Sequence, residues 1–492
     1  MNRHPEAWDL IVVGGGTAGI VAAKTAAGLG ARVLLIERHK TGGDCLWTGC
    51  VPSKSILAVA HIAAVAKLGR HMGITIPNAT INFPAVMNYV KSAIAEIAPQ
   101  DSPEVLGSAG ITVIHGNAFF TSLNSISIDG VTDQFVKALI ATGAAPTIPA
   151  IPGLRESNYL TSENVWELEE LPTKLVIVGA GSIGCELGQA FNRLGSEVTL
   201  IDSAGRILPR EDESASRFLT NQLTSEGIKI LTSAKVQRIE TDALGQGHIL
   251  FDIPNVEGEN IAFDRILIAI GRSPRTTGLG LDNAGVEISK QGFVVTSKSL
   301  RTTNRNIWAA GDITGHPQFT HVAGIHASTA ASNAVLGLSR KAETSTIPRV
   351  TFTDPEVAAV GLSTTENNPK FRILERPNSE VDRAITESRQ NGTTKIVVDS
   401  KGRIVGGMTV GPRAGEILAE ITLAMRLGLK TRDLASTIHP YPTYGDGLWN
   451  IAIADFRNQL SAPNMKFVIK ILREFAKFKS ILTQNQLHGR KK

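Results

Sequence analysis

The stretch Asp9-Leu-Ile-Val-Val-Gly-Gly-Gly-Thr-Ala-Gly19 decides the fold of this 492-residue chain. Its first residues form a short apolar run to Val13, which is typical of a buried parallel strand. Gly14, Gly16 and Gly19 then form a G-x-G-x-x-G turn, and an alanine-rich helical pattern follows directly. Such glycines permit a tight turn, a close approach of the backbone to a pyrophosphate and close packing of helix on strand. The stretch therefore predicts the start of a dinucleotide-binding fold.

An acidic residue completes this first site. The next apolar strand, Arg32–Ile36, ends in Glu37, which is correctly placed to hydrogen-bond ribose hydroxyls. The helix N-terminus would offer N–H groups and the positive end of its dipole to the phosphates. A glycine-rich turn alone is weak evidence. Strand, glycines, helix, second strand and acid in this order predict a dinucleotide site.

The same pattern recurs in the middle of the chain. The apolar strand Lys174–Val178 leads into Gly179, Gly181 and Gly184, and the strand after the following helix ends in Asp202. An acid in this place accepts hydrogen bonds from the ribose 2′-OH of NADH and repels the 2′-phosphate of NADPH. The second site is therefore predicted to favour NADH, although two nearby arginines could soften that preference.

Two of the three cysteines, Cys45 and Cys50, lie in the segment Gly42-Gly-Asp-Cys-Leu-Trp-Thr-Gly-Cys-Val-Pro-Ser-Lys54. The proline favours a helix start here, and a helix N-terminus lowers the pKa of a thiol. Lys54 would lie one helical turn after Cys50 and could add positive charge. A zinc site needs about four ligands, and the sequence has no second cysteine pair to complete one. The pair is predicted to be a redox-active dithiol/disulfide, with two inert thiols as the alternative.

Together these motifs resemble the class I pyridine nucleotide–disulfide oxidoreductases, the family of glutathione reductase, dihydrolipoamide dehydrogenase and mercuric reductase. The resemblance implies an α/β fold with two Rossmann-like domains, the NAD domain inserted in the FAD domain, and an α+β C-terminal dimerisation domain. It implies FAD at the first site, NADH or NADPH at the second, and a homodimer. By the same resemblance, Cys50 would be the charge-transfer thiolate beside the flavin and Cys45 the interchange thiol that meets the substrate. Lys54 would pair with Glu186 beside the flavin and the nicotinamide.

The resemblance also assigns further cofactor contacts and the domain boundaries. Thr142 and Gly143 resemble the crossing out of the FAD domain, and Gly271 resembles the exit from the NAD domain. Gly311 and Asp312 resemble the loop that closes the FAD site, where Asp312 would accept a hydrogen bond from the ribityl chain. The predicted domains are FAD-binding at 1–152 and 275–346, NAD(P)-binding at 153–274, an interface domain at 347–455 and a basic amphipathic helical tail at 456–492.

The segment His439-Pro-Tyr-Pro-Thr-Tyr-Gly-Asp446 departs from part of the family pattern. In members that use glutathione or lipoamide, a catalytic histidine precedes a glutamate by five residues. Here Tyr441 holds the histidine position relative to Asp446, and His439 lies two residues too early; tyrosine in this place is the pattern of mercuric reductases. Tyrosine (pKa about 10) is a poorer proton donor than histidine (about 6.5), whereas metal reduction needs soft thiolate ligands. Tyr441 and Asp446 of the partner subunit would face the substrate.

The mercuric reductase pattern is itself incomplete. No cysteine follows Cys185, so the C-terminal cysteine pair that hands metal to the site in those enzymes has no counterpart here, and neither has their N-terminal metal-binding domain. Cys185 itself is expected to be a packing residue.

The composition is that of a soluble globular protein, with 42% hydrophobic and 19% charged residues. No apolar run approaches the roughly 18 residues that would predict a transmembrane helix, and the N-terminus has no signal-peptide core, so a cytoplasmic protein is expected. The tail, 456–492, has nine Lys and Arg and one acid, a net charge of +8. Since the whole chain carries +5, residues 1–455 carry −3, and no nucleic-acid-binding core is expected.

The tail has the pattern of a basic amphipathic helix. Apolar residues recur at helical spacing with lysines between them: Val468, Ile471, Leu472, Phe475, Phe478 and Leu482. Such a helix could give residues 463–492 a peripheral contact with an anionic membrane surface. It could equally pack on its own dimer.

We therefore expect a homodimeric enzyme that passes electrons from NAD(P)H through FAD to the Cys45–Cys50 disulfide and then to a thiophilic metal ion. The two cysteines would hold Hg(II) transiently, with no resident metal. The alternative is the reduction of a small disulfide or a quinone, with His439 as the acid. A third possibility is a non-enzymatic flavoprotein that serves as a docking subunit.

Overall fold

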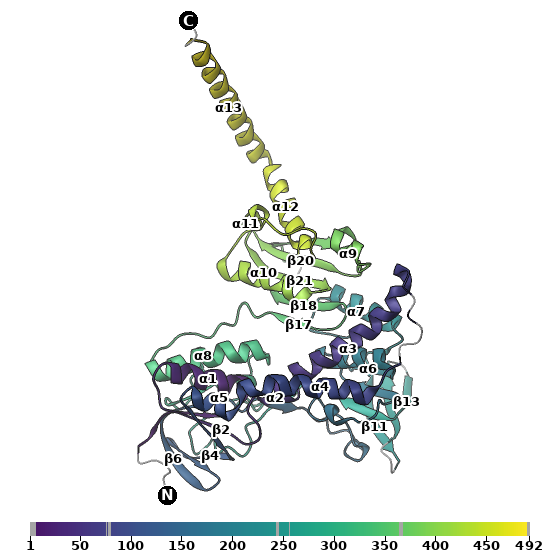
Figure 1. Ribbon diagram of the computed structural model, residues 1–492, viewed down its shortest axis with the longest axis vertical. Coiled ribbons are helices and arrows are strands. Elements are labelled where there is room, and N and C mark those ends of the chain that lie inside the picture. Colours follow the sequence, from purple (N-terminus) through teal and green to yellow (C-terminus); the bar gives the residue numbers. More distant parts are fainter. Residues whose placement is uncertain are drawn as a thin grey trace. The chain divides into compact units, whose positions relative to one another are not determined.

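The computed structural model describes residues 6–74, 76, 80–242, 246–254, 256–363 and 368–489, with the backbone alone for 67, 68, 70, 71 and 482–489. The chain divides into two compact units, Met1–Asp354 and Pro355–Lys492 (Figure 1). Both units combine helices with strands, as the predicted α/β class requires.

The first unit contains most of the strands. These are β1 (Trp8–Val13), β2 (Val33–Glu37), β3 (Ile111–His115), β4 (Ala118–Ser122), β5 (Ser125–Ile128), β6 (Val131–Ile140), β7 (Ala144–Pro146), β8 (Lys174–Val178), β9 (Glu197–Ile201), β10 (Lys229–Leu231), β11 (Lys235–Thr241), β12 (Gly247–Ile253), β13 (Val256–Phe263), β14 (Arg265–Ile268), β15 (Arg272–Pro274), β16 (Ile307–Ala309) and β17 (Arg349–Thr351). Its helices are α1 (Thr17–Gly28), α2 (Gly43–Trp47), α3 (Cys50–Leu68), α4 (Phe83–Ile97), α5 (Pro103–Ser108), α6 (Ser182–Leu194), α7 (Glu213–Ser225) and α8 (Thr320–Leu336).

The larger sheet of this unit follows from the opening apolar stretch. Its strand order is β3-β2-β1-β6-β5-β4, with β16 paired to β6, and β1 runs parallel to both β2 and β6. Side chains alternate between the faces of a strand, so Leu10 and Val12 enter one core while Ile11 and Val13 enter the other. Both faces are covered, which explains why β1 is apolar throughout.

Helices α1 and α8 pack against each other over the first of these cores. Their buried positions are mostly alanines, which let helix backbones approach closely: Ala18, Ala22, Ala23, Ala26, Ala323, Ala327, Ala330 and Ala331. Because of this packing, the N-termini of α1 and α8, which are far apart in the sequence, belong to one layer of the unit.

A second parallel sheet has the order β10-β9-β8-β14, and the antiparallel sheet β11-β12-β13 shares its core. The chain enters this region after β7 and leaves it at β15, and these two strands pair antiparallel, with Ala144 opposite Pro274. Two separate parallel sheets, each opened by a glycine-rich turn, are what the repeated sequence pattern predicts.

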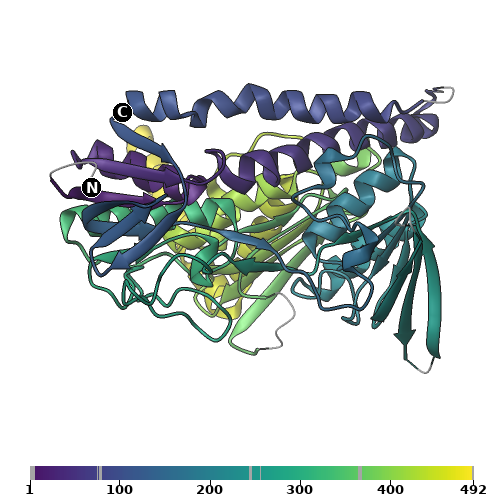
Figure 2. The ribbon, with the colours of Figure 1, turned by 90° about the horizontal axis from the view of Figure 1, so that it is seen from below.

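The cysteine-bearing helices α2 and α3 lie between β2 and β3 in the sequence. Helix α3 contacts α6 of the second region, and Figure 2 shows α3 and α4 side by side along one edge of the unit. By length and composition, the helical stretch Gly43–Ala66 alone among the described residues could cross a membrane. Within this stretch, α3 packs on α4 and α6.

The second unit is built on antiparallel strands in the order β18-β21-β20-β19, which are β18 (Glu356–Gly361), β21 (Ile404–Gly411), β20 (Thr393–Asp399) and β19 (Phe371–Pro377). Its helices are α9 (Asp382–Thr386), α10 (Ala414–Leu427), α11 (Thr431–Ser436), α12 (Asp446–Leu460) and α13 (Pro463–Gly489). Helices α10 and α12 pack on the sheet. The predicted tail helix is thus α13, which begins after α12 has ended at Leu460.

Candidate active site

The two cysteines lie on two consecutive helices. Cys45 lies within α2, and Cys50 is the first residue of α3. The two thiols are hydrogen-bonded to each other. The Cys50 thiol also lies 3.3 Å from the hydroxyl of Thr320, the first residue of α8. Two sulfur atoms are therefore held together at the N-termini of two helices.

The two thiols differ in acidity. The hydrogen bond from Cys45 lowers the pKa of Cys50 to about 6, helped by Thr320 and the charge of Lys54, although burial opposes the shift. The same hydrogen bond, together with burial, raises the pKa of Cys45 well above its usual range. At neutral pH the reduced pair therefore consists of a Cys50 thiolate and a Cys45 thiol.

The structure brings Lys54 and Glu186 together. The Lys54 ammonium donates to the Glu186 carboxylate at 2.8 Å, across the contact between α3 and α6. Glu186 is buried, and its second oxygen accepts the backbone N–H of Phe352 at 2.9 Å. The Lys54 ammonium also lies 4.4 Å from the centre of the Phe352 ring. A charged pair is thus fixed one helical turn from the Cys50 thiolate.

The first glycine-rich turn has the geometry that a bound dinucleotide requires. Gly14 has φ +106°, and a Cβ on Gly19 would overlap the carbonyl oxygen of Gly14, so neither position accepts a side chain. Gly16 caps α1. The Glu37 carboxylate accepts the Gly15 N–H at 2.6 Å, which places the acid against the loop.

Residues from distant parts of the chain gather at this loop. Gly311, at the end of β16, approaches Ala18 of α1 so closely that a Cβ on it would lie 3.1 Å from the Ala18 Cβ. The next residue, Asp312, has a pKa raised by burial, against the opposing charge of Arg272 at 3.6 Å. A half-buried acid and two helix N-termini around a glycine-rich loop fit the pyrophosphate and polyol of FAD.

The crossing between the two parallel sheets is also ordered by hydrogen bonds. The Thr142 hydroxyl donates to the carbonyl of Arg275 at 2.8 Å, and the Arg275 N–H donates to the carbonyl of Gly143 at 3.0 Å. Arg272 forms an ion pair with Asp44, the residue before Cys45. The exit strand β15 is therefore tied directly to the cysteine loop.

The second glycine-rich turn repeats the first. Gly179 has φ +108°, Gly181 caps α6, and a Cβ on Gly184 would overlap the Gly179 carbonyl oxygen. The Asp202 carboxylate accepts the Ala180 N–H at 2.6 Å, just as Glu37 accepts the equivalent N–H of the first loop. Gly271 immediately precedes β15 and has φ +134°, and a Cβ on it would meet no atom within 4 Å.

One of the two arginines near Asp202 is already engaged. The Arg206 guanidinium donates to the backbone carbonyls of Leu208 and Pro209. It is therefore held by its own loop.

In the second unit, His439 and Tyr441 have separate partners. His439 hydrogen-bonds Glu420 through Nε2 at 2.8 Å and the Thr437 carbonyl through Nδ1 at 2.9 Å, and its ring stacks on Trp449. Burial opposes protonation of His439, but Glu420 outweighs it and raises the His439 pKa. Both ring nitrogens are therefore occupied within the unit.

Tyr441 is exposed, and its hydroxyl donates to the Asp382 carboxylate at 2.6 Å, a contact that raises its pKa. Asp446 is buried and accepts the Thr443 N–H at the start of α12. Asp446 therefore orders the turn that follows Tyr441, while the tyrosine itself is open to solvent.

Three further residues of the site, Thr320, Phe352 and Arg272, were not predicted from the sequence. Thr320 and Phe352 touch the reactive groups through a side chain or an N–H from elements more than 130 residues away in the sequence. Their residue types are common at helix starts and in strands, so no sequence signal marks them. Arg272 directly follows Gly271 at the predicted exit from the NAD domain. This position in the sequence could have marked Arg272 as a residue near the site.

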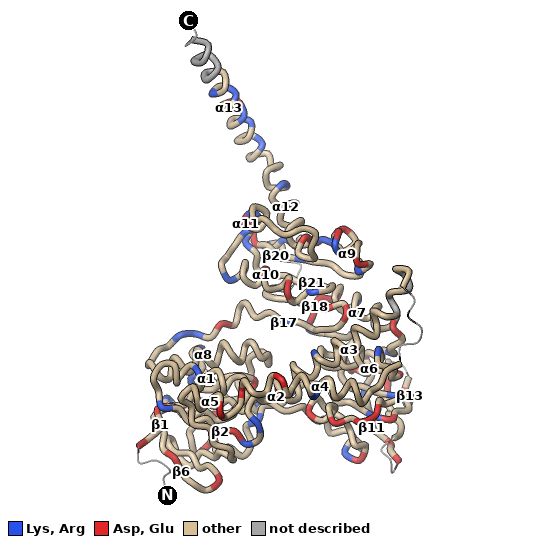
Figure 3. The backbone as a smooth tube through the Cα atoms, in the orientation of Figure 1, with Lys and Arg blue, Asp and Glu red and all other residues tan. Residues whose placement is uncertain are grey.

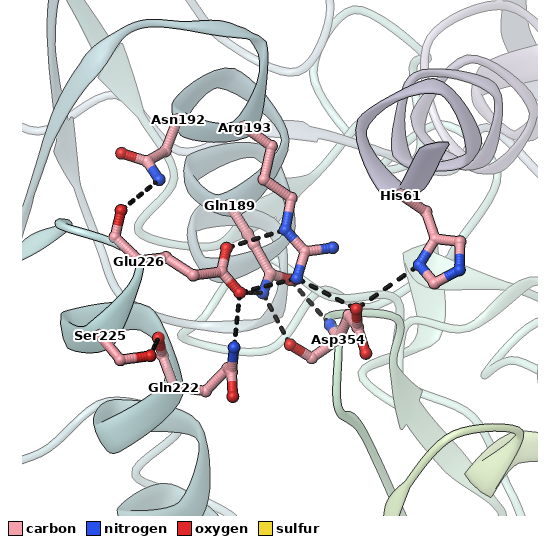
Figure 4. A network of polar contacts seen from close by, with 8 residues as sticks. All are labelled: His61, Gln189, Asn192, Arg193, Gln222, Ser225, Glu226 and Asp354. Atoms are coloured by element: carbon pink, nitrogen blue, oxygen red, sulfur yellow. Dashed lines mark hydrogen bonds and ion pairs between the residues drawn. The ribbon is translucent and has the colours of Figure 1, made fainter. Parts of the chain in front are cut away.

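A buried polar network joins the helices that carry the charged pair (Figure 4). Arg193 of α6 donates to Glu226, which follows α7, at 2.6 Å and to Asp354 at 3.0 Å. Asp354 lies 3.5 Å from His61 of α3, and its N–H donates to Gln189 of α6 at 2.7 Å. The network ties α3 to α6, and so holds Lys54 against Glu186.

The comparisons with known proteins agree with this geometry. Residues 8–327 match the family model described as pyridine nucleotide-disulphide oxidoreductase, and residues 347–452 match the dimerisation domain of the same family. The chain is 36% identical to mercuric reductase from Bacillus cereus over 461 residues, which are 92% of this chain and 72% of the relative.

Other relatives have different names. The chain is 35% identical to dihydrolipoyl dehydrogenase from Chlamydia trachomatis over 450 residues, 90% of this chain and 95% of that protein. Among solved structures, the Cu(II) complex of the HOCl-induced flavoprotein disulfide reductase RclA from Escherichia coli is similar, with a TM-score of 0.81 and 27% identity. That alignment covers 91% of this chain and 99% of RclA.

Proposed function

Since the chain belongs to the pyridine nucleotide–disulphide oxidoreductase family, we propose that it reduces a thiophilic metal ion, with Hg(II) as the type substrate. Members of the family use FAD and NAD(P)H, and this chain is an FAD-dependent oxidoreductase of that kind. The match to the dimerisation domain supports a homodimer. The identity of the electron acceptor is the part that we propose.

The observation that carries the proposal is the thiol pair itself. A Cys50 thiolate and a Cys45 thiol lie hydrogen-bonded to each other, and two adjacent sulfur ligands suit a soft, linear-binding metal ion. In this proposal the metal is a substrate that the two thiols bind and release.

The expected overall reaction is balanced: NAD(P)H and Hg(II) give NAD(P)⁺, Hg(0) and one proton. Bound FAD supplies the two-electron relay from the nicotinamide. The Cys45 thiol loses its proton as the two sulfur atoms bind the metal. The Lys54 ammonium stabilises the negative charge of the Cys50 thiolate. Glu186 and Phe352 keep that ammonium in place.

A second candidate, reduction of a small disulfide, is favoured by the likeness to dihydrolipoyl dehydrogenases. A thiol leaving group benefits from a proton donor that titrates near neutral pH. Tyr441 has a raised pKa, and His439 is engaged by Glu420 within its own unit. These contacts make the metal ion the better-supported acceptor.

The deciding experiment measures NAD(P)H oxidation by the purified FAD-loaded protein with Hg(II), glutathione disulfide, lipoamide and a quinone in parallel, and collects Hg(0) vapour. We expect turnover and vapour with Hg(II), and the loss of both in Cys45→Ser and Cys50→Ser. Cys185→Ser is the matched control, because Cys185 is buried and its sulfur contacts only a backbone carbonyl among the hydrogen bonds described. Fast turnover with lipoamide and none with Hg(II) would refute the proposal.

A further inference from the structure

Helix α13 is the part of the chain that the family does not account for. It runs from Pro463 to Gly489, and the match to the dimerisation domain ends at 452. Figure 1 shows α13 as a single long helix that extends beyond α12, away from the sheet of the second unit. The helix therefore calls for an explanation separate from the oxidoreductase scaffold.

Large apolar side chains cover one broad side of α13. Phe467 and Phe475 are each about two-thirds exposed, at 65% and 67%. The exposed apolar residues of the helix are Met465, Phe467, Val468, Ile471, Leu472, Phe475, Phe478 and Ile481. At about 100° per residue, these positions span an arc of about 200° around the helix. That arc is wider than the narrow seam of a two-stranded coiled coil.

The opposite side carries a basic stripe. Lys466, Lys470, Arg473 and Lys477 are spaced at i, i+4, i+7 and i+11, which places them on one face of the helix. Figure 3 shows these positions in blue along the helix. Glu474 is the single acid of the segment, and it pairs with Lys477 at 2.9 Å. The stripe thus has a strong net positive charge.

We propose that α13 lies in the plane of a membrane surface that contains anionic lipids. Its apolar side would enter the boundary between headgroups and acyl chains, and the basic stripe would face lipid phosphates. Long Lys and Arg side chains can extend from the edge of a buried helix to the phosphate level. The geometry of the helix thus matches a lipid surface on both of its sides.

A transmembrane orientation does not fit the same helix. Charged residues recur every three or four positions from Lys466 to Lys477, and several would then lie in the hydrocarbon centre at high cost. A second copy of α13 does not fit either. Pairing through the apolar sides would leave the basic stripe, which lies opposite, without compensating negative charge, whereas anionic lipids supply that charge.

The test uses the full-length, FAD-loaded protein and vesicles of phosphatidylcholine alone or mixed with phosphatidylglycerol. We expect cosedimentation with the mixed vesicles, weakening as salt is added, and little with phosphatidylcholine alone. Truncation after Ala462 should abolish binding. Reversal of Lys466, Lys470, Arg473 and Lys477 to Glu should lower partitioning at least about 100-fold, since each cation near an anionic surface contributes several-fold.

Two further variants separate charge from apolar contact. Lys229, Lys290, Lys298 and Lys341, which are exposed in the first unit, are reversed to Glu as a control with the same change in net charge. This control should bind vesicles nearly as the parent does. The triple variant Phe467→Ser, Phe475→Ser and Phe478→Ser keeps the basic stripe. It should still lower vesicle binding at least about 10-fold, because the burial of three aromatic rings is lost.

Flavin absorbance and NAD(P)H oxidation show that each variant is folded, and sedimentation velocity gives its oligomeric state. Unchanged vesicle binding after truncation would overturn the proposal. So would conversion of the truncated protein from dimer to monomer without vesicles, because the helix would then pack on a second copy of the chain. The proposal would also be contradicted if reversing the four lysines of the first unit lowered vesicle binding as much as reversing the basic stripe of α13.

Discussion

The reactivity of Cys50 rests on three neighbours that reach it from different elements. Cys45 donates a hydrogen bond to it, Thr320 contacts it from α8, and Lys54 adds positive charge from its own helix. Each contact stabilises the thiolate over the thiol, and together they outweigh the cost of burial. The acidity of one sulfur atom therefore depends on the packing of α3 and α8 around it.

We predict that alkylation of the dithionite-reduced protein by iodoacetamide has a midpoint near pH 6, because the thiolate of Cys50 is present above its pKa and is lost below it. Thr320→Val removes one hydrogen bond and should move the midpoint upward, toward the ordinary thiol value of about 8.5. Mass spectrometry of the labelled peptide identifies the cysteine. A parent midpoint above pH 8 would contradict the assignment, and Cys50→Ser should lack the low-pH reaction.

Nucleotide preference is also a property of one residue. Asp202→Asn keeps an oxygen that accepts the Ala180 N–H but removes the charge that repels a 2′-phosphate. We expect kcat/KM for NADPH to rise roughly 10-fold relative to NADH, equivalent to about 1.4 kcal/mol. Glu197→Gln, at the opposite and exposed end of β9, is the control and should leave the ratio unchanged. A parent enzyme that strongly prefers NADPH would refute the prediction.

At the level of elements, the contact between α3 and α6 brings the reactive groups together. Lys54 and Glu186 meet across this contact, and the network of Arg193, Glu226 and Asp354 supports it from behind (Figure 4). The three network side chains are largely buried, so each charge depends on the others for compensation. A substitution in this network should therefore weaken the positioning of Lys54 and Glu186, although the network residues do not contact the two cysteines.

We predict that Arg193→Met destabilises the first unit by about 3 kcal/mol, because Glu226 and Asp354 are left as buried carboxylates with fewer partners. Thermal unfolding of the FAD-loaded protein should show the lower midpoint. Arg238→Met is the matched control: Arg238 pairs with Glu240 at 2.6 Å, but both side chains are more than half exposed. Its effect should stay below about 1 kcal/mol. Equal effects of the two variants would show that the network adds nothing beyond a surface pair.

At the scale of the whole molecule, the sequence predicted the elements whose signals are local. The glycine-rich turns with Glu37 and Asp202 are continuous patterns, and the structure forms both with the same hydrogen bond. The Lys54–Glu186 pair could be named only through the family resemblance. The contacts from Thr320 and Phe352 could not be predicted, because they arise from tertiary packing between segments that no local pattern connects.

The dimerisation-domain match leads to a prediction about the complete assembly. We expect Tyr441 to act at the cysteine pair of the partner subunit rather than at its own. A Cys50→Ser homodimer should be inactive with Hg(II), and a Tyr441→Phe homodimer should be slowed roughly 10-fold, a loss of about 1.4 kcal/mol. A heterodimer of the two variants then contains one site with both native residues.

If Tyr441 acts across the dimer, this heterodimer, purified with two affinity tags, should recover about half of the parent activity. If Tyr441 acts within its own chain, no complete site forms, because one site lacks Cys50 and the other lacks the tyrosine hydroxyl. Activity would then stay at half that of the Tyr441→Phe homodimer. The two arrangements therefore predict heterodimer rates that differ about 10-fold, which is the expected ratio between a site with Tyr441 and a site with phenylalanine in its place. Stoichiometric reduction of the bound FAD by NAD(P)H, read as loss of flavin absorbance without any added acceptor, controls for intact flavin in every species.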